Sequence, residues 1–379
     1  MKVLICCVNR FDHPSGLCRF AANLALCLAT SSQIDKVTVV VGRWQMPHFL
    51  NCFQLSNPKI ELIQALCDNT LLSRYIWYYR GLQKLINIHN PDVFHFSFPL
   101  PFNSRSIGVP TVTTVHDVYA YDAPSTIGFP NVFMSRHILR SSVKKSSAIV
   151  CISRFTQTRL QHYFPTMNKK IYQAVIYQYV QKLVPPSNRQ SDRPQFILSV
   201  AQHHSNKNLD ILIRAFGILH GNGNISSDTR LYLVGGTGSQ TEILESIVKE
   251  IGLADRVDML GTINDAELAK LYADCDVFAT TSSIEGFCLP AVEASMMSAR
   301  IVSSDIPVLR EVCGDCATYF SLHGDPVINL ANAIRYALDL PKSKLNPLLM
   351  RYSLANCRDS YLCLYRYLMN SQTAPLLKS

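Results

Sequence analysis

Two glutamates separated by seven residues, Glu285 and Glu293, are the side chains in the sequence that most invite a chemical role. Pro290 between them suits the first turn of a helix, where its missing N–H would have no partner in any case. Glu293 then lies about one turn into this helix, and Glu285 lies in the loop before it. Ionised carboxylates only accept hydrogen bonds, so the pair could bind the hydroxyl groups of sugars. Two acids near a helix start could equally do no more than complement its dipole.

The loop between the two glutamates could hold an anion. Gly286 is flexible and can turn the backbone amides of Phe287, Cys288 and Leu289 toward an anion at the positive end of the helix. A diphosphate would fit at this position.

A lysine could bind the same kind of anion. Lys207 follows a predicted strand at 196–200 and precedes a predicted helix at 209–219. Ser205 or Asn206 can cap that helix, which would place Lys207 in its first turn, where the dipole disfavours a cation unless an anion is bound. The alternative is an exposed, solvated lysine. His204 is a second candidate cation, which would become charged as the pH falls through about 6.5.

Other patterns have weaker chemical interpretations. His203 and His204 would point to opposite sides of a strand end, and no matched cysteine or carboxylate set accompanies them as a zinc site requires. No metal site is therefore expected. The segment 313–316, Cys-Gly-Asp-Cys, has the spacing of a redox pair. A glycine cluster that includes Gly235 resembles a dinucleotide-binding loop only loosely.

The first half of the chain carries candidates at two predicted strand ends. Gly16 lies in a short segment that follows the first strand and opens a helix. His116 and Asp117 follow a buried strand at 111–115, and open parallel sheets place their active groups at such strand ends. A lone histidine at such a position is more often structural.

Alternating strands and helices must position all of these residues. Apolar runs typical of buried strands occur at 3–8, 37–41, 93–96, 111–115, 148–152, 196–200, 230–234, 257–260, 277–280 and 299–303. Amphipathic stretches typical of helices occur at 19–29, 73–88, 209–219, 242–251, 265–273, 290–297 and 345–369. Strands separated by helix-length segments imply right-handed crossovers and parallel sheets.

The pattern lapses across 181–194, where prolines and polar residues predict a linker. A chain of 379 residues, 48% of them hydrophobic, is long enough for two cores. We therefore expect an α/β protein with two doubly wound domains, residues 1–184 and 185–345. A helical segment, 346–379, is expected to pack back across them.

Composition and charge restrict the expected cellular location and the expected binding partners of the protein. The 13 cysteines have no regular spacing and predict reduced thiols in a cytoplasmic protein. The apolar run at the amino terminus is too short for a signal peptide, and nowhere do the roughly 20 apolar residues of a membrane span occur together. The net charge of +9 suits phosphate-bearing ligands or peripheral contact with an anionic membrane at its inner surface. No arginine-rich run or aromatic-basic repeat favours nucleic acid.

Glu285 and Glu293, with Gly286-Phe287 and Leu289-Pro290 between them, resemble the Glu-x7-Glu signature of retaining GT-B glycosyltransferases, specifically of family four. The flanking segments 265–278 and 301–312 are similar to that family too, and the similarity extends over essentially the whole chain. The resemblance implies two Rossmann-like domains that face a cleft. It also implies a nucleotide diphosphate sugar as donor, with no cofactor, and a saccharide or lipid-linked acceptor.

The resemblance implies a role for each candidate. Glu293 would hold the nucleotide ribose, Lys207 the donor phosphates, and Glu285 the donor sugar. His116 would contact or polarise the sugar, and Gly16 and Asp117 would lie on the acceptor side. The expected catalytic residues are thus His116, Lys207 and Glu285. The expected donor site comprises Gln202, Lys207, Gly235, Glu285, Gly286, Phe287, Cys288, Leu289 and Glu293. For the 313–316 segment the resemblance implies a plain loop.

We therefore expect a retaining enzyme that moves a hexose, with mannose as a candidate, by front-face attack and without a metal, as in polysaccharide or glycolipid synthesis. Three residues depart from the family pattern: Gln202 replaces an arginine, and Ser15 and Cys288 replace glycines. These departures leave open a nonenzymatic sugar-nucleotide-binding protein. A GT-B epimerase or phosphorylase is a second alternative.

Overall fold

The computed structural model describes residues 1–13, 15–102, 107–166, 171–184, 193–342 and 348–373. The chain separates into two compact units. Unit 1 comprises Met1–Val180 and the C-terminal segment that starts at Arg351, and unit 2 comprises Gln181–Met350. The chain thus leaves unit 1 directly before the segment in which the sequence predicts a linker.

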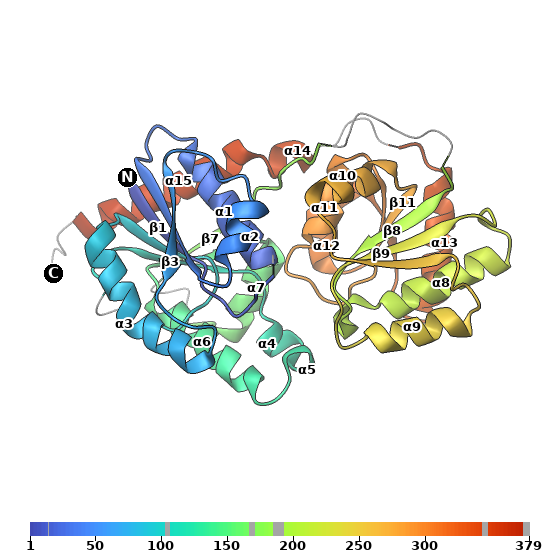
Figure 1. The fold of residues 1–379 in the computed structure, drawn as a ribbon, viewed down its shortest axis with the longest axis horizontal. Helices are drawn as coiled ribbons and strands as arrows, with labels where there is room; N and C mark the ends of the chain where they lie inside the picture. The colour runs from blue at the N-terminus through green and yellow to red at the C-terminus, as the bar shows by residue number, and fades with distance from the viewer. Residues whose placement is uncertain (14, 103–106, 167–170, 185–192, 343–347, 374–379) are drawn as a thin grey trace. The chain divides into compact units, whose positions relative to one another are not determined.

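Unit 1 is built on a seven-stranded parallel sheet (Figure 1). Its strands are β1 (Lys2–Cys6), β2 (Lys36–Gly42), β3 (Ile60–Ala65), β4 (Val93–Phe96), β5 (Thr111–Val115), β6 (Ala148–Cys151) and β7 (Tyr172–Val175). Their order across the sheet is β3-β2-β1-β4-β5-β6-β7, and every neighbouring pair is parallel. The central strands β1, β4, β5 and β6 are almost completely buried, as expected where helices cover both faces of a parallel sheet.

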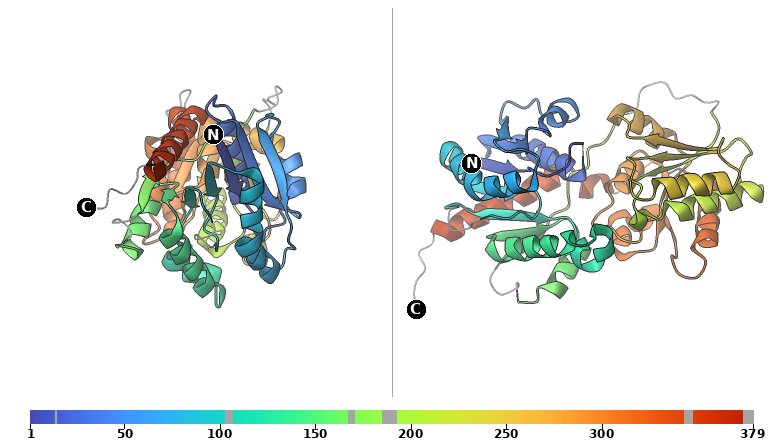
Figure 2. Two further views of the ribbon diagram at one scale, coloured as in Figure 1. Left: turned by 90° about the vertical axis from the view of Figure 1, so that its left-hand side faces the viewer. Right: turned by 60° about the horizontal axis from the view of Figure 1, so that its bottom comes forward.

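The helices of unit 1 are α1 (Gly16–Ala29), α2 (Met46–Asn51), α3 (Leu71–His89), α4 (Tyr119–Asp122), α5 (Pro124–Ile127), α6 (Asn131–Lys145), α7 (Arg154–Tyr163) and α15 (Leu354–Thr373). Helix α1 begins at Gly16 because the Ser15 side chain accepts a hydrogen bond from the Cys18 N–H. Helix α15 packs against α1 and runs along unit 1 (Figure 2). Its Tyr361 and Tyr365 are fully buried there.

The C-terminal helical segment is interrupted. The sequence predicts one helix over 345–369, whereas the structure has α14 (Leu348–Arg351) and α15, with Tyr352 and Ser353 between them. Tyr352 is fully buried, and its carbonyl accepts a hydrogen bond from the Val180 N–H at 3.1 Å. The interruption therefore coincides with the point at which the chain is tied to the end of the first segment of unit 1.

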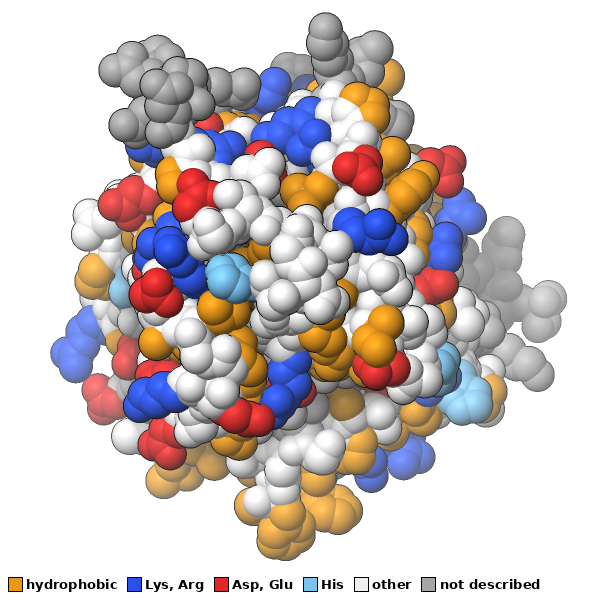
Figure 3. Space-filling model, turned by 90° about the vertical axis from the view of Figure 1, so that its right-hand side faces the viewer, with side chains coloured by type: hydrophobic (Ala, Val, Ile, Leu, Met, Phe, Trp, Pro, Cys, Tyr) orange, Lys and Arg blue, Asp and Glu red, His pale blue; other side chains and the backbone are white. Residues whose placement is uncertain are grey.

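Unit 2 is built on a six-stranded parallel sheet of β8 (Phe196–Val200), β9 (Arg230–Val234), β10 (Val257–Gly261), β11 (Val277–Thr280), β12 (Arg300–Ser304) and β13 (Ala317–Phe320), in the order β10-β9-β8-β11-β12-β13. Its helices are α8 (Leu209–Gly221), α9 (Thr241–Glu250), α10 (Asp265–Asp274), α11 (Leu289–Met296), α12 (Pro307–Cys313) and α13 (Pro326–Asp339). On the face that carries α8, α9 and α13, charged side chains of both signs are scattered among apolar and neutral ones (Figure 3).

Each sheet has one point where the direction of strand addition reverses. In unit 1 this switch point lies between β1 and β4, and in unit 2 it lies between β8 and β11. Open parallel sheets bind their ligands outside the carboxyl ends of the strands at such a point. The loops that follow these four strands are therefore where functional side chains are expected.

No helix in the described part of the chain combines the length and the apolar character that a membrane crossing needs.

Candidate active site

The two loops at the switch point of unit 2 are joined by direct contacts. The loop after β8 ends in a short 3-10 turn, Ser205–Lys207, and the loop after β11 leads into α11. The Asn208 side-chain amide donates to the Thr281 carbonyl at 2.9 Å. The Thr281 hydroxyl donates to the Lys207 carbonyl at 2.6 Å. The two loops thus form one surface at the carboxyl edge of the sheet.

Lys207 and Glu285 meet on this surface. Lys207 Nζ lies 2.5 Å from Glu285 Oε1, and the Ser282 hydroxyl donates to the same oxygen at 2.7 Å. The Lys207 side chain is 20% exposed and that of Glu285 is 10% exposed. The fold therefore brings together two residues that the sequence analysis had singled out separately. An ammonium has three N–H donors, so Lys207 could hold Glu285 and an anion at the same time.

Lys207 lies before helix α8 and not in its first turn. The N-cap residue of α8 is Asn208, in the left-handed conformation with φ of 46° and without a side-chain cap bond. Ser205 and Asn206, the caps suggested by the sequence, lie in the preceding 3-10 turn. That cap prediction is wrong because the chain inserts an extra turn, in which Asn208 uses its side chain to bind the neighbouring loop.

Cys288 is the N-cap residue of α11, and it is left-handed, with φ of 71°. A side chain in this conformation costs roughly 1–2 kcal/mol, and glycine avoids the cost. Its thiol is buried 3.7 Å from the Thr280 hydroxyl, and burial raises the pKa of Cys288 to about 12. Cys288 is therefore a protonated thiol at neutral pH, and its contribution is the backbone turn that leads from Glu285 into α11.

Glu293 lies in α11, 7% exposed, where the Tyr272 hydroxyl donates to Glu293 Oε2 at 3.0 Å. Tyr272 comes from α10 and is fully buried. The sequence pattern did not single out Tyr272; its only signal is a tyrosine in the last turn of the amphipathic helix before β11. This hydroxyl fixes the orientation of the Glu293 carboxylate.

The loop after β9 packs directly on the loop after β8. A Cβ atom on Gly235 would lie 2.0 Å from the Ala201 carbonyl oxygen, and one on Gly238 would lie 2.4 Å from the His203 carbonyl oxygen. Only glycine permits these approaches. Gln202, between the two contacts, is exposed.

His203 and His204 have different environments. His203 is buried, with Nδ1 3.0 Å from the Thr241 hydroxyl, whereas His204 is exposed. Desolvation lowers the pKa of His203 and, where the protein partly covers the ring, that of His204, and the charge of Lys207 further lowers the pKa of His204. His204 is therefore uncharged at neutral pH and adds no cation there. Within the described ranges, no group of three or more histidine, cysteine, aspartate or glutamate side chains could hold a metal ion.

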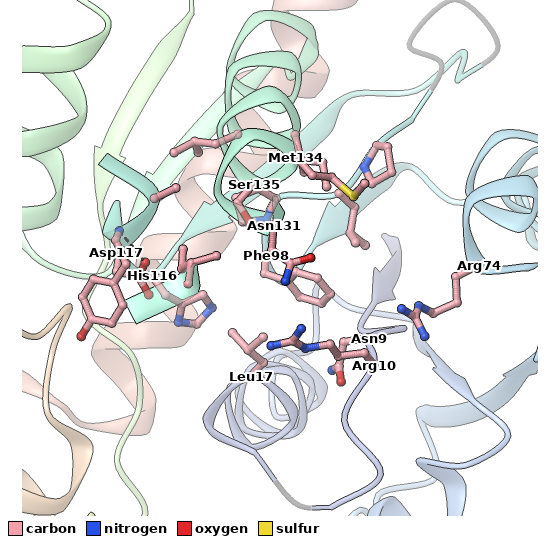
Figure 4. Close-up of a pocket in the computed structure, with 18 of the residues that line it drawn as sticks. Asn9, Arg10, Leu17, Arg74, Phe98, His116, Asp117, Asn131, Met134 and Ser135 are labelled. Atoms are coloured by element: carbon pink, nitrogen blue, oxygen red, sulfur yellow. Dashed lines mark hydrogen bonds between the residues drawn. The ribbon is translucent and has the colours of Figure 1, made fainter. Parts of the chain in front are cut away.

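The loops at the switch point of unit 1 open onto a cavity of about 510 Å³ (Figure 4). Asn9 and Arg10 line it from the loop after β1, Phe98 from the loop after β4, and His116 and Asp117 from the loop after β5. Helices α3 and α6 contribute Leu71, Arg74, Tyr75, Tyr78, Asn131, Met134, Ser135, Ile138 and Leu139. The sequence predicted that His116 and Asp117 lie at this edge, but its pattern indicated none of the cavity residues of α3 and α6.

His116 is held in one tautomer. Its Nε2 lies 2.8 Å from the Ser97 carbonyl oxygen, which can only accept, so Nε2 carries the proton and Nδ1 is left as an acceptor. The ring is in edge contact with Phe20, and burial lowers the pKa of His116 to about 4. His116 is therefore neutral at physiological pH. Asp117 beside it accepts a hydrogen bond from the Tyr119 N–H at 3.0 Å.

Gly16 lies next to a residue that lines the cavity of unit 1. It is the first residue of α1, and its neighbour Leu17 lines the cavity. A Cβ atom on Gly16 would have no heavy atom of the described residues within 4 Å. The packing of the described part of unit 1 therefore does not itself require glycine at this position.

Comparisons with known proteins agree with this architecture. The family model for glycosyl transferases group 1 matches residues 181–347, and the model for glycosyltransferase family 4 matches residues 14–177. The O-antigen chain mannosyltransferase RfbU of Salmonella typhimurium is 26% identical over 79% of this chain and 81% of its own length. The O-antigen chain mannosyltransferase B of Escherichia coli is 26% identical over 83% of this chain and 85% of its own length.

The fold has close counterparts among solved structures. HepE of Anabaena, crystallised with UDP and glucose, superposes with a TM-score of 0.69 over 97% of this chain and 100% of its own, at 18% identity. Each unit is built on a parallel sheet with one switch point, and a family model matches each unit. These findings identify the family. The chain belongs to glycosyltransferase family 4 and is a glycosyltransferase of the GT-B fold.

Proposed function

We propose that the protein is a retaining enzyme that transfers a hexose from a nucleotide diphosphate sugar to a hydroxyl group of a saccharide or lipid-linked acceptor. The observation that carries this proposal is the contact between Lys207 and Glu285 at the switch point of unit 2. It sets a cation and a hydroxyl-binding carboxylate side by side next to the start of α11. The names of the two relatives above favour mannose as the sugar.

The chemistry proposed for unit 2 is stabilisation of the departing diphosphate. Negative charge grows on its oxygens as the bond to the sugar breaks, and preorganised donors aimed at such charge supply much of the catalysis. Lys207 and the backbone amides of 286–289, at the positive end of the α11 dipole, are the donors that we assign to it. Glu285 would bind sugar hydroxyls, and Glu293, held by Tyr272, would bind the ribose hydroxyls.

The acceptor is assigned to the cavity of unit 1. Neutral His116 has Nδ1 available to accept a hydrogen bond, so we assign it to a hydroxyl group of the sugar and not to the diphosphate. Such a contact orients the hydroxyl for front-face attack. Asp117 and Gly16 would lie on the acceptor side of the site.

We propose that the acceptor side of unit 1 faces an anionic membrane surface. Helices α3 and α6 contain no acidic residue, and besides the buried Arg74 they contain six lysines and arginines. They also expose apolar side chains, namely Leu71, Leu72, Ile76, Tyr79, Phe133 and Met134. A basic surface with exposed apolar side chains binds anionic lipid through electrostatic attraction and through insertion of the apolar side chains.

Leu72→Glu should weaken sedimentation with phosphatidylglycerol vesicles, because it removes an exposed apolar side chain and adds a negative charge. Ile243→Glu, in an exposed position of α9, should not weaken it.

The decisive test of the proposed reaction is transfer from radiolabelled donors, GDP-mannose and UDP-hexoses, to a saccharide-lipid acceptor. We expect one donor to support transfer and the product to keep the anomeric configuration of that donor, which NMR can determine. EDTA should not abolish turnover, because Lys207 and the amides replace a metal. An inverted product, or turnover that EDTA stops and magnesium or manganese restores, would contradict the mechanism. Hydrolysis or isomerisation of the donor without transfer would favour the epimerase alternative.

A further inference from the structure

Two arginines line the cavity of unit 1. Arg10 lies in the loop after β1 and Arg74 in the first turns of α3, and Figure 4 shows both guanidinium groups directed into the cavity. Asn69 links them. Arg74 Nη1 donates to Asn69 Oδ1 at 2.5 Å and to the Asn69 carbonyl at 2.9 Å, and Asn69 Nδ2 donates to the Arg10 carbonyl at 3.1 Å. The loop and the helix therefore present two cations to one cavity.

Arg74 is a buried cation without a carboxylate partner. It is 8% exposed, and among the described residues neither Arg74 nor Arg10 forms an ion pair. An arginine stays protonated in proteins, so burial cannot remove its charge. A buried charge without a counter-charge is unfavourable, and the neutral oxygens of Asn69 offset this only in part. The cavity is therefore suited to an anionic ligand.

The two functional ends of the cavity are separate. Figure 4 shows His116 and Asp117 at one end and Arg74 at the other, with Phe98 and the guanidinium group of Arg10 between them. The neutral His116 suits a hydroxyl group and the arginines suit an anion. A ligand that spans the cavity would therefore carry both kinds of group.

We propose that Arg10 and Arg74 bind a phosphate or diphosphate group of the acceptor while its reacting hydroxyl lies at His116. This inference rests on the proposed function, because it takes the cavity to be the acceptor site. A guanidinium group can donate two parallel N–H bonds to phosphate oxygens, which makes arginine well suited to this group. The acceptor class is therefore a phosphorylated saccharide, or a saccharide joined to a lipid through a diphosphate. A neutral saccharide would leave the charge of Arg74 unbalanced.

Calorimetry on the full chain with farnesyl diphosphate tests the subsite. Farnesol, which lacks the diphosphate, and dihexanoylphosphatidylglycerol, which carries a membrane-type phosphodiester, serve as comparison ligands. Hydrogen bonds to charged groups correspond to about 10-fold to 150-fold in affinity. We expect Arg74→Met and Arg10→Met each to weaken farnesyl diphosphate binding by at least about tenfold, and Arg74→Lys by less than Arg74→Met.

Two control variants separate this site from others. Arg80→Met removes an exposed cation from the same helix, outside the cavity, and should leave the affinity unchanged. Lys207→Met alters the donor site and should weaken nucleotide binding without changing farnesyl diphosphate binding. Because Arg10 is exposed, its variant should fold even if Arg74→Met does not.

Three results would overturn the inference. Farnesol could bind as tightly as farnesyl diphosphate, Lys207→Met could abolish diphosphate binding, or Arg80→Met could weaken it as much as Arg74→Met does. Equal, Arg74-dependent binding of dihexanoylphosphatidylglycerol would assign the subsite to membrane head groups and overturn its assignment to the acceptor. A wild-type chain that binds farnesyl diphosphate through Arg74 but binds no nucleotide sugar would contradict the proposed function and leave the arginine site intact.

Discussion

In unit 2, neighbouring side chains fix the orientation of the carboxylates of Glu285 and Glu293. Lys207 and the Ser282 hydroxyl both contact one oxygen of Glu285, and Tyr272 contacts one oxygen of Glu293. A carboxylate with a fixed orientation loses less conformational freedom when it binds a hydroxyl group, which increases affinity. In the proposed donor site these carboxylates would therefore be preorganised acceptors for hydroxyl groups.

Glu293→Gln should weaken nucleotide binding. The amide keeps the shape of the side chain but removes its charge, and hydrogen bonds to charged groups contribute roughly 1.5–3 kcal/mol. We expect calorimetry with the donor nucleotide to show a loss of about tenfold or more. Tyr272→Phe should give a smaller loss, because the carboxylate remains and only its orienting bond is removed. Unchanged affinity in Glu293→Gln would exclude Glu293 from the nucleotide site.

The buried histidines of unit 1 should make its stability depend on pH. Burial lowers the pKa of His116 to about 4 and of His95 to about 3, whereas an unfolded histidine has a pKa of about 6.5. Between these values the unfolded chain binds more protons than the folded one, so stability is lost as the pH falls. We expect the free energy of unfolding to decrease from about pH 6.5 toward pH 4, and less steeply in His116→Gln. Identical pH profiles for the two proteins would show that His116 is not held neutral.

At the scale of elements, helix α15 is tied into unit 1 through a buried polar contact. The Tyr365 hydroxyl lies 2.6 Å from His95 Nδ1, and Thr114 Oγ1 lies 2.8 Å from the other ring nitrogen. His95 is on β4 and Thr114 on β5, the strands that lead into the loops of Phe98 and His116. The C-terminal helix thus supports the strands that lead to the cavity of unit 1.

Tyr365→Phe should destabilise the protein without altering the packing of α15. It would leave His95 Nδ1 buried without a partner, which costs about 1–3 kcal/mol. Tyr367→Phe is the matched control, because Tyr367 lies on the same helix and is 51% exposed. Denaturant unfolding should show the loss for Tyr365→Phe alone. Equal stabilities for the two variants would mean that the contact with His95 contributes nothing.

The sequence predicted the central strands of both sheets but none of β3, β7 and β13. All three lie at the edge of a sheet, and their residues are mostly half-buried. An edge strand is covered less completely, so it lacks the continuous apolar run that marks a strand buried on both faces. Among the helices of seven or more residues, α6, α7, α12 and α13 were also not predicted.

Part of the candidate site could be predicted because its residues follow buried strands. Lys207, Glu285 and His116 each follow a predictable buried strand, so their place at the carboxyl edge follows from the topology. Tyr272 and Arg74 reach their partners from helices, and the sequence pattern does not show which helical side chains meet a strand end. The cap of α8 was misplaced at Ser205 or Asn206 because the contact of Asn208 with the Thr281 carbonyl is set by tertiary packing.

At the scale of the whole molecule, the chain forms two units of similar architecture. In the proposed function, unit 2 binds the donor through Lys207 and Glu285, which contact each other before α11, and through Glu293 within α11. Unit 1 places His116 and Asp117 on a cavity that two arginines also line, and we propose this cavity as the acceptor site. The central claim is that Lys207 stabilises the charge that develops on the leaving diphosphate, because Gln202 stands where an arginine is expected.

Single-turnover kinetics of Lys207→Met with saturating donor tests this claim most directly. Methionine keeps the apolar stem of the side chain and removes its charge. A charged hydrogen bond of roughly 1.5–3 kcal/mol corresponds to about 10-fold to 150-fold in rate, so we expect a loss of at least about tenfold. Glu285→Gln distinguishes the loss of the cation from the loss of its ion pair, since it leaves the charge of Lys207 in place. A loss smaller than about threefold in Lys207→Met would contradict the placement of the diphosphate at Lys207.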